Sequence, residues 1–276
     1  CRHYLVPYEN GFLPAYRFSP KSSKGSIVLF GGFDSYAEEL FKVALTMNEA
    51  GYDIILFEGP GQGSALEDYH IPMTHEWEKP VKTILDYFQL DDVTLFGMSL
   101  GGYLVIRAAA FETRVKRVIA HNICADFYEV LLKQFPEDIK KSIDNLVSNN
   151  NEENAIVANG LFKDTAANSL LLKWMLTQGM HITGSKDPYE FFTKMKLYNT
   201  SGISSKLNQD VLLTAGQEDH YIPLNQFFEQ SKSLVNIRTL TTRLFTHKEM
   251  AQNHCQLGNL GISLEVILNW IEQITE

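Results

Sequence analysis

The feature that most constrains the fold is the repeated alternation of short apolar runs with amphipathic segments. The runs Ile27–Phe30 and Ile54–Phe57 are unbroken by polar residues, as expected for strands that are covered on both faces. Each run leads through a glycine-rich loop into a segment whose apolar residues have helical spacing. Repeated strand–helix units predict a parallel sheet with right-handed crossovers and helices on both faces. The predicted fold class is therefore α/β.

Further strands extend this pattern toward both ends of the chain. The first twenty residues predict a hairpin with its turn at Asn10-Gly11. After the central units, the chain returns to strand-like runs before a closing amphipathic helix. The additional predicted strands are Tyr4–Tyr8, Phe12–Phe18, Val93–Phe96, Val115–Ala120, Val211–Ala215 and Arg238–Phe245.

The alternation is interrupted by a long segment that is helical in pattern and holds no convincing strand. We assign this insertion to residues 125–205, between core segments 1–124 and 206–276. Ligands bind at the carboxyl edge of the sheet in open α/β folds, so the simplest interpretation is a helical lid over that edge. A structural helical subdomain that contacts no site is the alternative.

Charge and cysteine content exclude several classes of protein. The 24 basic and 33 acidic residues give a net charge of −9 without a Lys/Arg cluster, which argues against nucleic acid and anionic lipid as partners. The longest uncharged stretch, Val93–Ile106, is shorter than the about 20 apolar residues that a membrane span requires. Three scattered cysteines do not form a disulfide scaffold or a zinc site, and they predict a reducing compartment, the cytoplasm.

The most specific motif is Gly97-Met98-Ser99-Leu100-Gly101, which matches Gly-x-Ser-x-Gly between a predicted strand and a predicted helix. A nucleophile on such a tight turn has a strained backbone, and side chains two positions to either side would collide with the adjoining strand and helix. We therefore predict that Ser99 is a nucleophile. The alternative is an ordinary glycine-rich turn in which Ser99 caps the helix.

A serine nucleophile requires a base within hydrogen-bond reach and a carboxylate that orients the base. In this architecture the acid follows a later strand and the histidine comes last in the chain. Asp219 lies on the loop after the strand Val211–Ala215, with Glu218 as its competitor. The base has to reach back from the long loop before the final helix, which favours His254 over His247.

Acyl transfer also requires donors for a developing oxyanion. The backbone amide of Leu100 is one predicted donor, because it follows the nucleophile at a helix N-terminus. The second comes from the loop after the first parallel strand, where Phe33 is preferred and Gly32 is next. The loop 59–63 lacks the Lys and Ser/Thr of a phosphate-binding loop, and the histidines show no metal-ligand spacing, so we expect no cofactor and no metal.

Several segments resemble hallmark segments of the α/β-hydrolase superfamily, and the match covers nearly the whole chain. They are Phe57–Gly63, Gly97–Gly102 and Gly216–Pro223. The tail Phe245–Asn259 resembles the capped branch labelled acylaminoacyl-peptidase-like or dipeptidyl-aminopeptidase-like. That branch also includes dihydroxypseudooxynicotine hydrolase and the fungal polyketide-shortening hydrolases. The resemblance implies an α/β-hydrolase fold, a mostly parallel sheet flanked by helices, with an inserted helical lid.

The resemblance also implies roles for individual residues. It assigns a catalytic triad to Ser99, Asp219 and His254, and the oxyanion hole to the backbone of Phe33 and Leu100. Members of the branch usually carry a further helical segment before a strand like Val6–Tyr8, and this chain begins at Cys1 rather than Met, so we expect an N-terminal truncation. Glu58 replaces the usual Asp of the superfamily, and we expect little functional consequence.

Together these features predict a serine hydrolase that acts on a small, mostly apolar ester or amide carbonyl compound, acyl-peptides included. One alternative is carbon–carbon bond hydrolysis in a β-diketone-like compound, which several relatives of the branch perform. A second alternative is a non-catalytic ligand-binding module on a hydrolase fold. We expect a small molecule or short peptide as the partner, with no nucleic acid and no membrane, and a homodimer remains open as the assembly.

Overall fold

The computed structural model describes residues 1–149 and 151–275. It divides into two compact units, of which the first comprises Cys1–Ala125 with Thr200–Glu276 and the second comprises Asp126–Asn199. The chain leaves the first unit after Ala125 and returns to it at Thr200. These two residues lie side by side, since the amide of Thr200 donates to the carbonyl of Ala125 at 2.9 Å.

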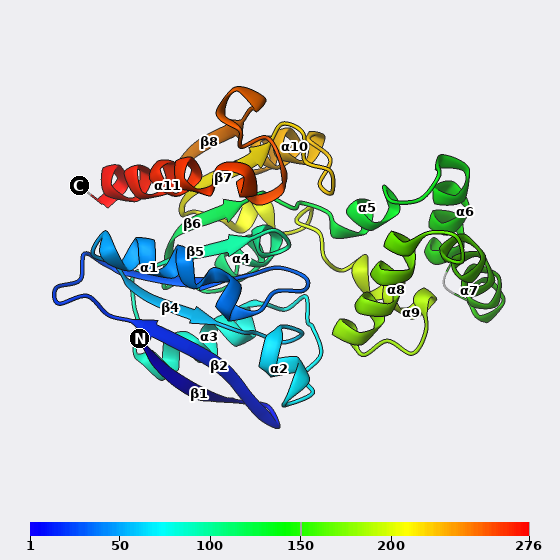
Figure 1. Cartoon of the computed structure of the whole chain (residues 1–276), viewed down its shortest axis with the longest axis horizontal. Coiled ribbons are helices and arrows are strands. Elements are labelled where there is room, and N and C mark those ends of the chain that lie inside the picture. Colours follow the sequence, from blue (N-terminus) through cyan, green and yellow to red (C-terminus); the bar gives the residue numbers. More distant parts are fainter. Residues whose placement is uncertain (150, 276) are drawn as a thin grey trace. The chain divides into compact units, whose positions relative to one another are not determined.

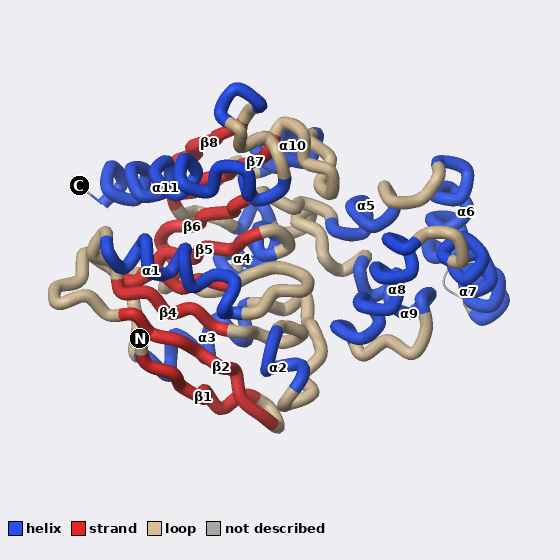
Figure 2. Tube along the Cα trace, in the orientation of Figure 1, coloured by secondary structure: helices blue, strands red, loops and turns tan. Residues whose placement is uncertain are grey.

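Within the described residues, the first unit is built on an eight-stranded sheet with the order β1-β2-β4-β3-β5-β6-β7-β8 (Figures 1 and 2). The strands from β3 to β8 pair in parallel, whereas β1 and β2 form a hairpin that adds to β4 in antiparallel fashion. The predicted α/β class is therefore confirmed. The strands are β1 (Arg2–Tyr8), β2 (Gly11–Phe18), β3 (Ser26–Phe30), β4 (Asp53–Phe57), β5 (Val93–Met98), β6 (Val115–His121), β7 (Asp210–Gly216) and β8 (Thr239–Phe245).

The first hairpin turns one residue earlier than the sequence predicted. Tyr8 pairs with Gly11, so Glu9 and Asn10 form the turn, and Glu9 takes a left-handed φ of 48°. Gly11 is needed for packing instead: a Cβ there would lie 2.8 Å from the Cβ of Tyr69. The turn prediction at Asn10-Gly11 was therefore wrong, because the glycine serves a close side-chain contact.

Helices cover both faces of the sheet. The helices α1 (Phe41–Glu49) and α11 (Leu260–Thr275) lie on one face, and α3 (Glu78–Phe88) and α4 (Gly101–Ala109) lie on the other (Figure 1). Alternate strand residues such as Ile27 and Leu29 share one buried cluster with Ile267 of α11. The intervening Val28 is also fully buried, which explains why the central strands are apolar at every position.

The second unit is helical and has its own aromatic core. Phe162 is fully buried, with its ring centroid 4.6 Å from that of Phe192 and 5.8 Å from that of Phe135. Residues 200–205, which the sequence assigned to the insertion, belong to the first unit, where the hydroxyl of Thr200 donates to Gln230 Oε1 at 2.5 Å. The helices are α5 (Phe127–Leu132), α6 (Glu137–Ser148), α7 (Glu152–Ala166), α8 (Leu170–Thr183) and α9 (Pro188–Met195).

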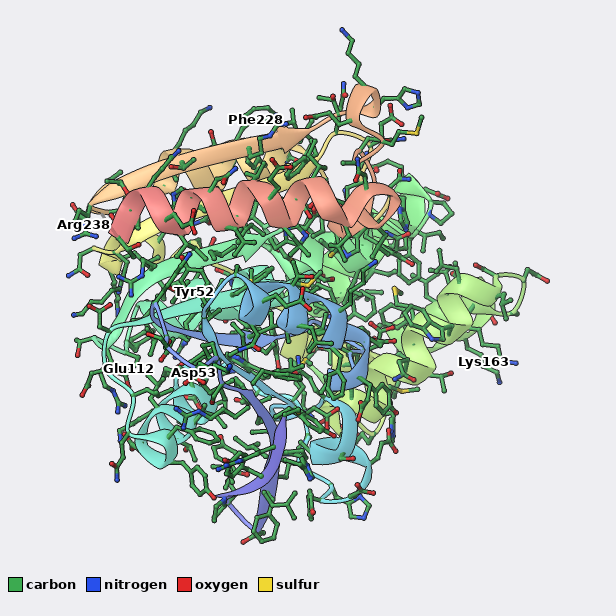
Figure 3. The ribbon with its side chains drawn as sticks, turned by 60° about the vertical axis from the view of Figure 1, so that its left-hand side comes forward. Tyr52, Asp53, Glu112, Lys163, Phe228 and Arg238 are labelled. Carbon is green, nitrogen blue, oxygen red and sulfur yellow. The ribbon has the colours of Figure 1, made fainter. Side chains whose placement is uncertain are left out.

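Ion pairs gather at the amino ends of the strands. Asp53, which begins β4, pairs with Arg17 at 2.7 Å, and Asp210, which begins β7, pairs with Arg238. Figure 3 shows Asp53, Glu112 and Arg238 along one edge of the first unit. The candidate site described next is built from loops at the opposite, carboxyl ends of the strands.

Candidate active site

Ser99 lies on a tight turn between β5 and α4. Its φ of 62° falls in the left-handed region that residues other than glycine rarely adopt. A Cβ at Gly97 would lie 2.1 Å from the carbonyl oxygen of Gly101, and a Cβ at Gly101 would lie 2.9 Å from that of Gly31. Both glycines of the motif are therefore required by close backbone approach.

The alternative role of Ser99 as a helix cap does not match the geometry. The N-cap of α4 is Leu100, and no side chain caps the helix there. The hydroxyl of Ser99 instead lies 2.8 Å from His254 Nε2. The backbone amide of Ser99 donates to the carbonyl of His121 at 3.1 Å, which fixes the turn against the end of β6.

Three side chains from distant parts of the chain meet at the carboxyl ends of the strands. Besides its contact with Ser99, His254 places Nδ1 2.7 Å from Asp219 Oδ2. A carboxylate can only accept a hydrogen bond, so the imidazole proton belongs on Nδ1 and Nε2 can accept from the serine hydroxyl. The structure thus brings together the three side chains predicted from the sequence.

The two competing residues lie elsewhere on the same loops. Glu218 is exposed, although it is adjacent to Asp219. His247 is also exposed, and its Nδ1 lies 3.1 Å from Gln252 Nε2. Neither of these side chains takes part in the contacts between Ser99, His254 and Asp219.

Asp219 is held by both backbone and side-chain donors. Its Oδ1 accepts from the amides of Tyr221 and Ile222 at 2.8 and 2.9 Å, and its Oδ2 accepts from His254 and from Asn122. Burial raises the pKa of Asp219, but the hydrogen bond and charge of His254 and the amides of Ile222 and Tyr221 outweigh it and leave the pKa below its ordinary value. The carboxylate is therefore ionised near neutral pH.

His254 is buried beside groups that favour its protonated form. Burial alone would lower the pKa of His254, but the Cys255 sulfur next to it and the Asp219 carboxylate raise the pKa above its ordinary value. The ring of Tyr221 also approaches the imidazole, with centroids 5.2 Å apart and an interplanar angle of 82°. The site is thus suited to hold the positive charge of an imidazolium.

The loop after β3 packs tightly against the serine turn. A Cβ at Gly32 would lie 2.9 Å from both the amide nitrogen of Leu100 and the Cβ of Ser99. The amide of Gly32 donates to Ser35 Oγ at 2.8 Å, so this alternative oxyanion donor is already engaged. Phe33, the preferred donor, follows directly on the same loop.

Two residues of the loop after β4 hold this arrangement together. Gln62 Nε2 donates to the carbonyls of Gly31 and Gly32, each at 2.9 Å. The buried carboxylate of Glu58 accepts from the amides of Ala37 and Ser64 at 2.9 and 2.8 Å. Sequence reasoning expected little consequence from Glu58 and gave Gln62 no role, although both lie in a segment that it had singled out.

Asn122 is a further residue of the site that sequence reasoning missed. It follows β6, is nearly fully buried, and donates through Nδ2 to Asp219 Oδ2. Its position just after a predicted strand placed it at the carboxyl edge of the sheet. Its contact with Asp219 could not be foreseen, because it depends on the pairing of β6 with β7 across the insertion.

Neither a candidate metal site nor a candidate membrane span occurs in the described residues. No group of three or more His, Cys, Asp or Glu side chains in ranges 1–149 and 151–275 is arranged to hold a metal ion. None of the helices in this part of the chain combines the length and apolar character that a membrane crossing requires.

Comparison with known proteins identifies the family. Residues 26–245 match the family described as alpha/beta hydrolase fold. The chain belongs to this family. It is a hydrolase of the α/β-hydrolase fold, as the resemblance implied.

Relatives of this hydrolase include several fungal proteins. Hydrolase acrC of Aspergillus aculeatus is 27% identical, with 97% of this chain and 68% of that protein covered. The 20-hydroxy-prefusarin hydrolase FUS2 of Gibberella moniliformis is 27% identical, with 83% of this chain and 58% of that protein covered. The chain thus spans 68% and 58% of the lengths of these two relatives.

A solved structure shares the fold. The 2,6-dihydroxy-pseudo-oxynicotine hydrolase superposes with a TM-score of 0.65 at 19% identity, with 98% of this chain and 66% of that chain covered. At this identity the likeness establishes the fold alone. The similarity to the fungal hydrolases agrees with the branch of α/β hydrolases that the tail of the sequence predicted.

Proposed function

We propose that this α/β hydrolase is a serine hydrolase in which Ser99 is the nucleophile, His254 the general base and Asp219 the orienting acid. The observation that carries the proposal is the pair of contacts made by one imidazole, 2.8 Å to Ser99 Oγ and 2.7 Å to Asp219 Oδ2. These are hydrogen-bond distances, and they give the imidazole the tautomer needed to accept the serine proton. The left-handed φ of Ser99 supports the same role.

The reaction proceeds in two halves. Ser99 Oγ attacks the substrate carbonyl carbon while its proton passes to His254 Nε2, and the carbonyl oxygen becomes an oxyanion that accepts from the amides of Leu100 and Phe33. The imidazolium then protonates the leaving group, and an acyl ester remains on Ser99. Water attacks this ester with His254 again as base, which releases the acid and restores the serine hydroxyl.

We propose the second unit, Asp126–Asn199, as a lid for this site. The support is its point of attachment: Ala125 and Thr200 are hydrogen-bonded to each other, and Ala125 lies three residues after Asn122, which contacts Asp219. A segment inserted at the carboxyl edge of a parallel sheet is well placed to enclose a ligand. We propose a small, mostly apolar ester or amide as the substrate, acyl-peptides included.

A second candidate reaction is carbon–carbon bond hydrolysis of a β-diketone-like compound. It uses the same serine site, with a carbon leaving group in place of an alcohol or amine. The similarity to fungal hydrolases, among them the 20-hydroxy-prefusarin hydrolase, favours it only together with the resemblance of the sequence tail to a branch with members that cleave such bonds.

A substrate panel run on wild type and Ser99→Ala tests these proposals. The panel contains short-chain aryl esters, amino-acyl and N-acyl-peptide anilides, and β-diketones. We expect ester or amide turnover in wild type and its loss in Ser99→Ala, whereas the exposed Ser233→Ala on α10 (Asn225–Ser233) serves as a matched control that keeps activity. Turnover of diketones alone selects the second candidate, and full activity in Ser99→Ala contradicts both.

A further inference from the structure

One residue contacts both the turn of the nucleophile and the loop of the base. The carbonyl of His121, the last residue of β6, accepts from the amide of Ser99 at 3.1 Å. The imidazole of the same residue is fully buried, and its Nε2 lies 3.3 Å from the carbonyl oxygen of Cys255, which directly follows His254. His121 therefore connects the two segments whose side chains meet in the 2.8 Å contact between Ser99 Oγ and His254 Nε2.

The partners of the His121 ring determine where its proton lies. A backbone carbonyl can only accept a hydrogen bond, so Nε2 of His121 carries a proton and donates to Cys255. Burial lowers the pKa of His121 to about 4, so the imidazole is neutral near neutral pH and Nδ1 is an acceptor. Thr214 Oγ1 lies 3.2 Å from this nitrogen. The same hydroxyl oxygen accepts from the amide of Asn122 at 3.0 Å, and its own proton is donated to His121.

The backbone that follows His254 requires a restraint of this kind. Cys255 has a φ of 50° and Gln256 has a φ of 51°. Successive left-handed residues other than glycine persist only where neighbouring contacts hold them. Cys255 is the member of this pair that is joined directly to His254, and its carbonyl is held by His121. The bond from His121 thus restrains the main chain at the point where it sets the direction of the His254 side chain.

We propose that His121 is a positioning residue that sets the distance between Ser99 Oγ and His254 Nε2, through a neutral imidazole that donates from Nε2 to the Cys255 carbonyl. This inference rests on the proposed function of Ser99 and His254. His121 acts through the main chain at both ends, through the amide of Ser99 and the carbonyl of Cys255. A buried strand residue between the two segments keeps the serine and the imidazole at hydrogen-bond distance before a substrate arrives.

Two substitutions of His121 separate its two side-chain hydrogen bonds. Glutamine places an amide nitrogen as many bonds from Cα as Nε2 of histidine, so His121→Gln can keep the donor to Cys255. Asparagine places its amide only as far as Nδ1, so His121→Asn can keep the contact with Thr214 but loses the donor to Cys255. Ile119→Val is the matched control, because Ile119 is apolar, fully buried and on the same face of β6 as His121.

The experiment measures kcat and KM for the best panel substrate, the rate of labelling by a fluorophosphonate, and the proton resonance of His254 Nδ1–H. We expect His121→Asn to lower kcat and the labelling rate about 10-fold with little change in KM, and to shift or broaden the resonance. His121→Gln is expected to stay within about 3-fold of wild type in both rates, because it keeps the donor. Ile119→Val is expected to lower the denaturation midpoint but to leave both rates and the resonance unchanged.

A measurement on the wild-type protein tests the tautomer without any substitution. The ring-nitrogen resonances of His121 are expected to show a proton on Nε2 and none on Nδ1 at neutral pH. A proton on Nδ1 instead overturns the inference, even where a variant of His121 fails to fold.

The inference is also overturned if folded His121→Asn keeps the wild-type kcat and His254 resonance, or if folded His121→Gln loses as much activity as His121→Asn. These outcomes are separable from the proposed function, because the resonances of His121 and His254 need no substrate. The inference can fail while Ser99→Ala still abolishes turnover. If Ser99→Ala keeps full activity, the serine mechanism fails, and the two resonances still report whether His121 holds the loop of His254.

Discussion

At the scale of single residues, the account depends on how the surroundings of His254 set its charge. Cys255 and Asp219 favour the imidazolium, whereas burial opposes it. The carboxyl group of Asp34, on the loop after β3, also interacts electrostatically with this imidazole. The balance raises the pKa of His254, so the neutral base predominates only toward alkaline pH.

This balance predicts the pH dependence of activity. Because only neutral His254 can accept the serine proton, kcat/KM is expected to rise with pH through a value above the ordinary histidine pKa of about 6.5. Asp219→Asn removes the carboxylate that raises this pKa, so its residual activity should rise at lower pH than that of the wild type. A pH–rate profile of both proteins makes the comparison. A wild-type midpoint at or below about 6.5 would contradict the account.

The close approach at Gly32 gives a second prediction at this scale. Gly32→Ala places a Cβ 2.9 Å from Leu100 N and Ser99 Cβ, so the loop has to move away from the serine turn. Since the loop carries Phe33 and adjoins Leu100, we expect kcat to fall about 100-fold, the scale of losing one oxyanion donor. Gly202→Ala is the control, because a Cβ at Gly202 meets no atom within 4 Å. Equal rates for the two variants would refute this role of the loop.

At the scale of elements, the positions of the strands were predicted from the sequence more accurately than the contacts between segments that lie far apart in the chain. Apolar runs such as Ile54–Phe57 mark strands because burial on both faces requires it. The hairpin turn was misplaced because Gly11 serves a contact with Tyr69, and that contact joins segments distant in sequence. The role of Asn122 was not predicted for the same reason. The strands β6 and β7 are neighbours in the sheet, but the whole insertion separates them in the chain.

Glu58 links the segment after β3 to the segment after β4, and substitution of Glu58 tests how much this link stabilises the protein. Glu58→Gln keeps one acceptor oxygen for the amides of Ala37 and Ser64, whereas Glu58→Ala leaves both buried amides without it. We expect Glu58→Ala to lower the free energy of unfolding by about 2–4 kcal/mol and Glu58→Gln by about 1–2 kcal/mol. Urea denaturation measures both, with the exposed Glu265→Gln of α11 as the control. Equal stability of Glu58→Ala and wild type would show that the carboxylate does not support the loops.

At the scale of the whole molecule, the chain consists of two units with separate cores. The alternation of strands and helices predicted the first unit, and the loss of that alternation located the second. The boundary differed from the prediction because residues such as Thr200 and Ser204 are hydrogen-bonded to Gln230 of the first unit. Only three-dimensional contacts reveal to which unit such polar residues belong.

Separate cores predict separate responses to a cavity. Phe162→Ala removes a fully buried ring from the second unit and is expected to cost about 3–5 kcal/mol there. Hydrogen exchange should therefore accelerate in α7 and α9 while the amides of β5 keep their protection. Phe162→Leu, which leaves a smaller void, should show a weaker effect of the same kind. Equal acceleration in β5 would show that the two units unfold as one.

The central claim is that Ser99 is the nucleophile of this hydrolase, activated by His254. It is tested most directly by labelling with a fluorophosphonate probe, followed by mass spectrometry of the peptides. The account predicts one stoichiometric adduct on Ser99, none in Ser99→Ala, and labelling slowed by orders of magnitude in a variant that lacks the His254 imidazole. An adduct on another residue, or undiminished labelling of Ser99→Ala, would contradict it.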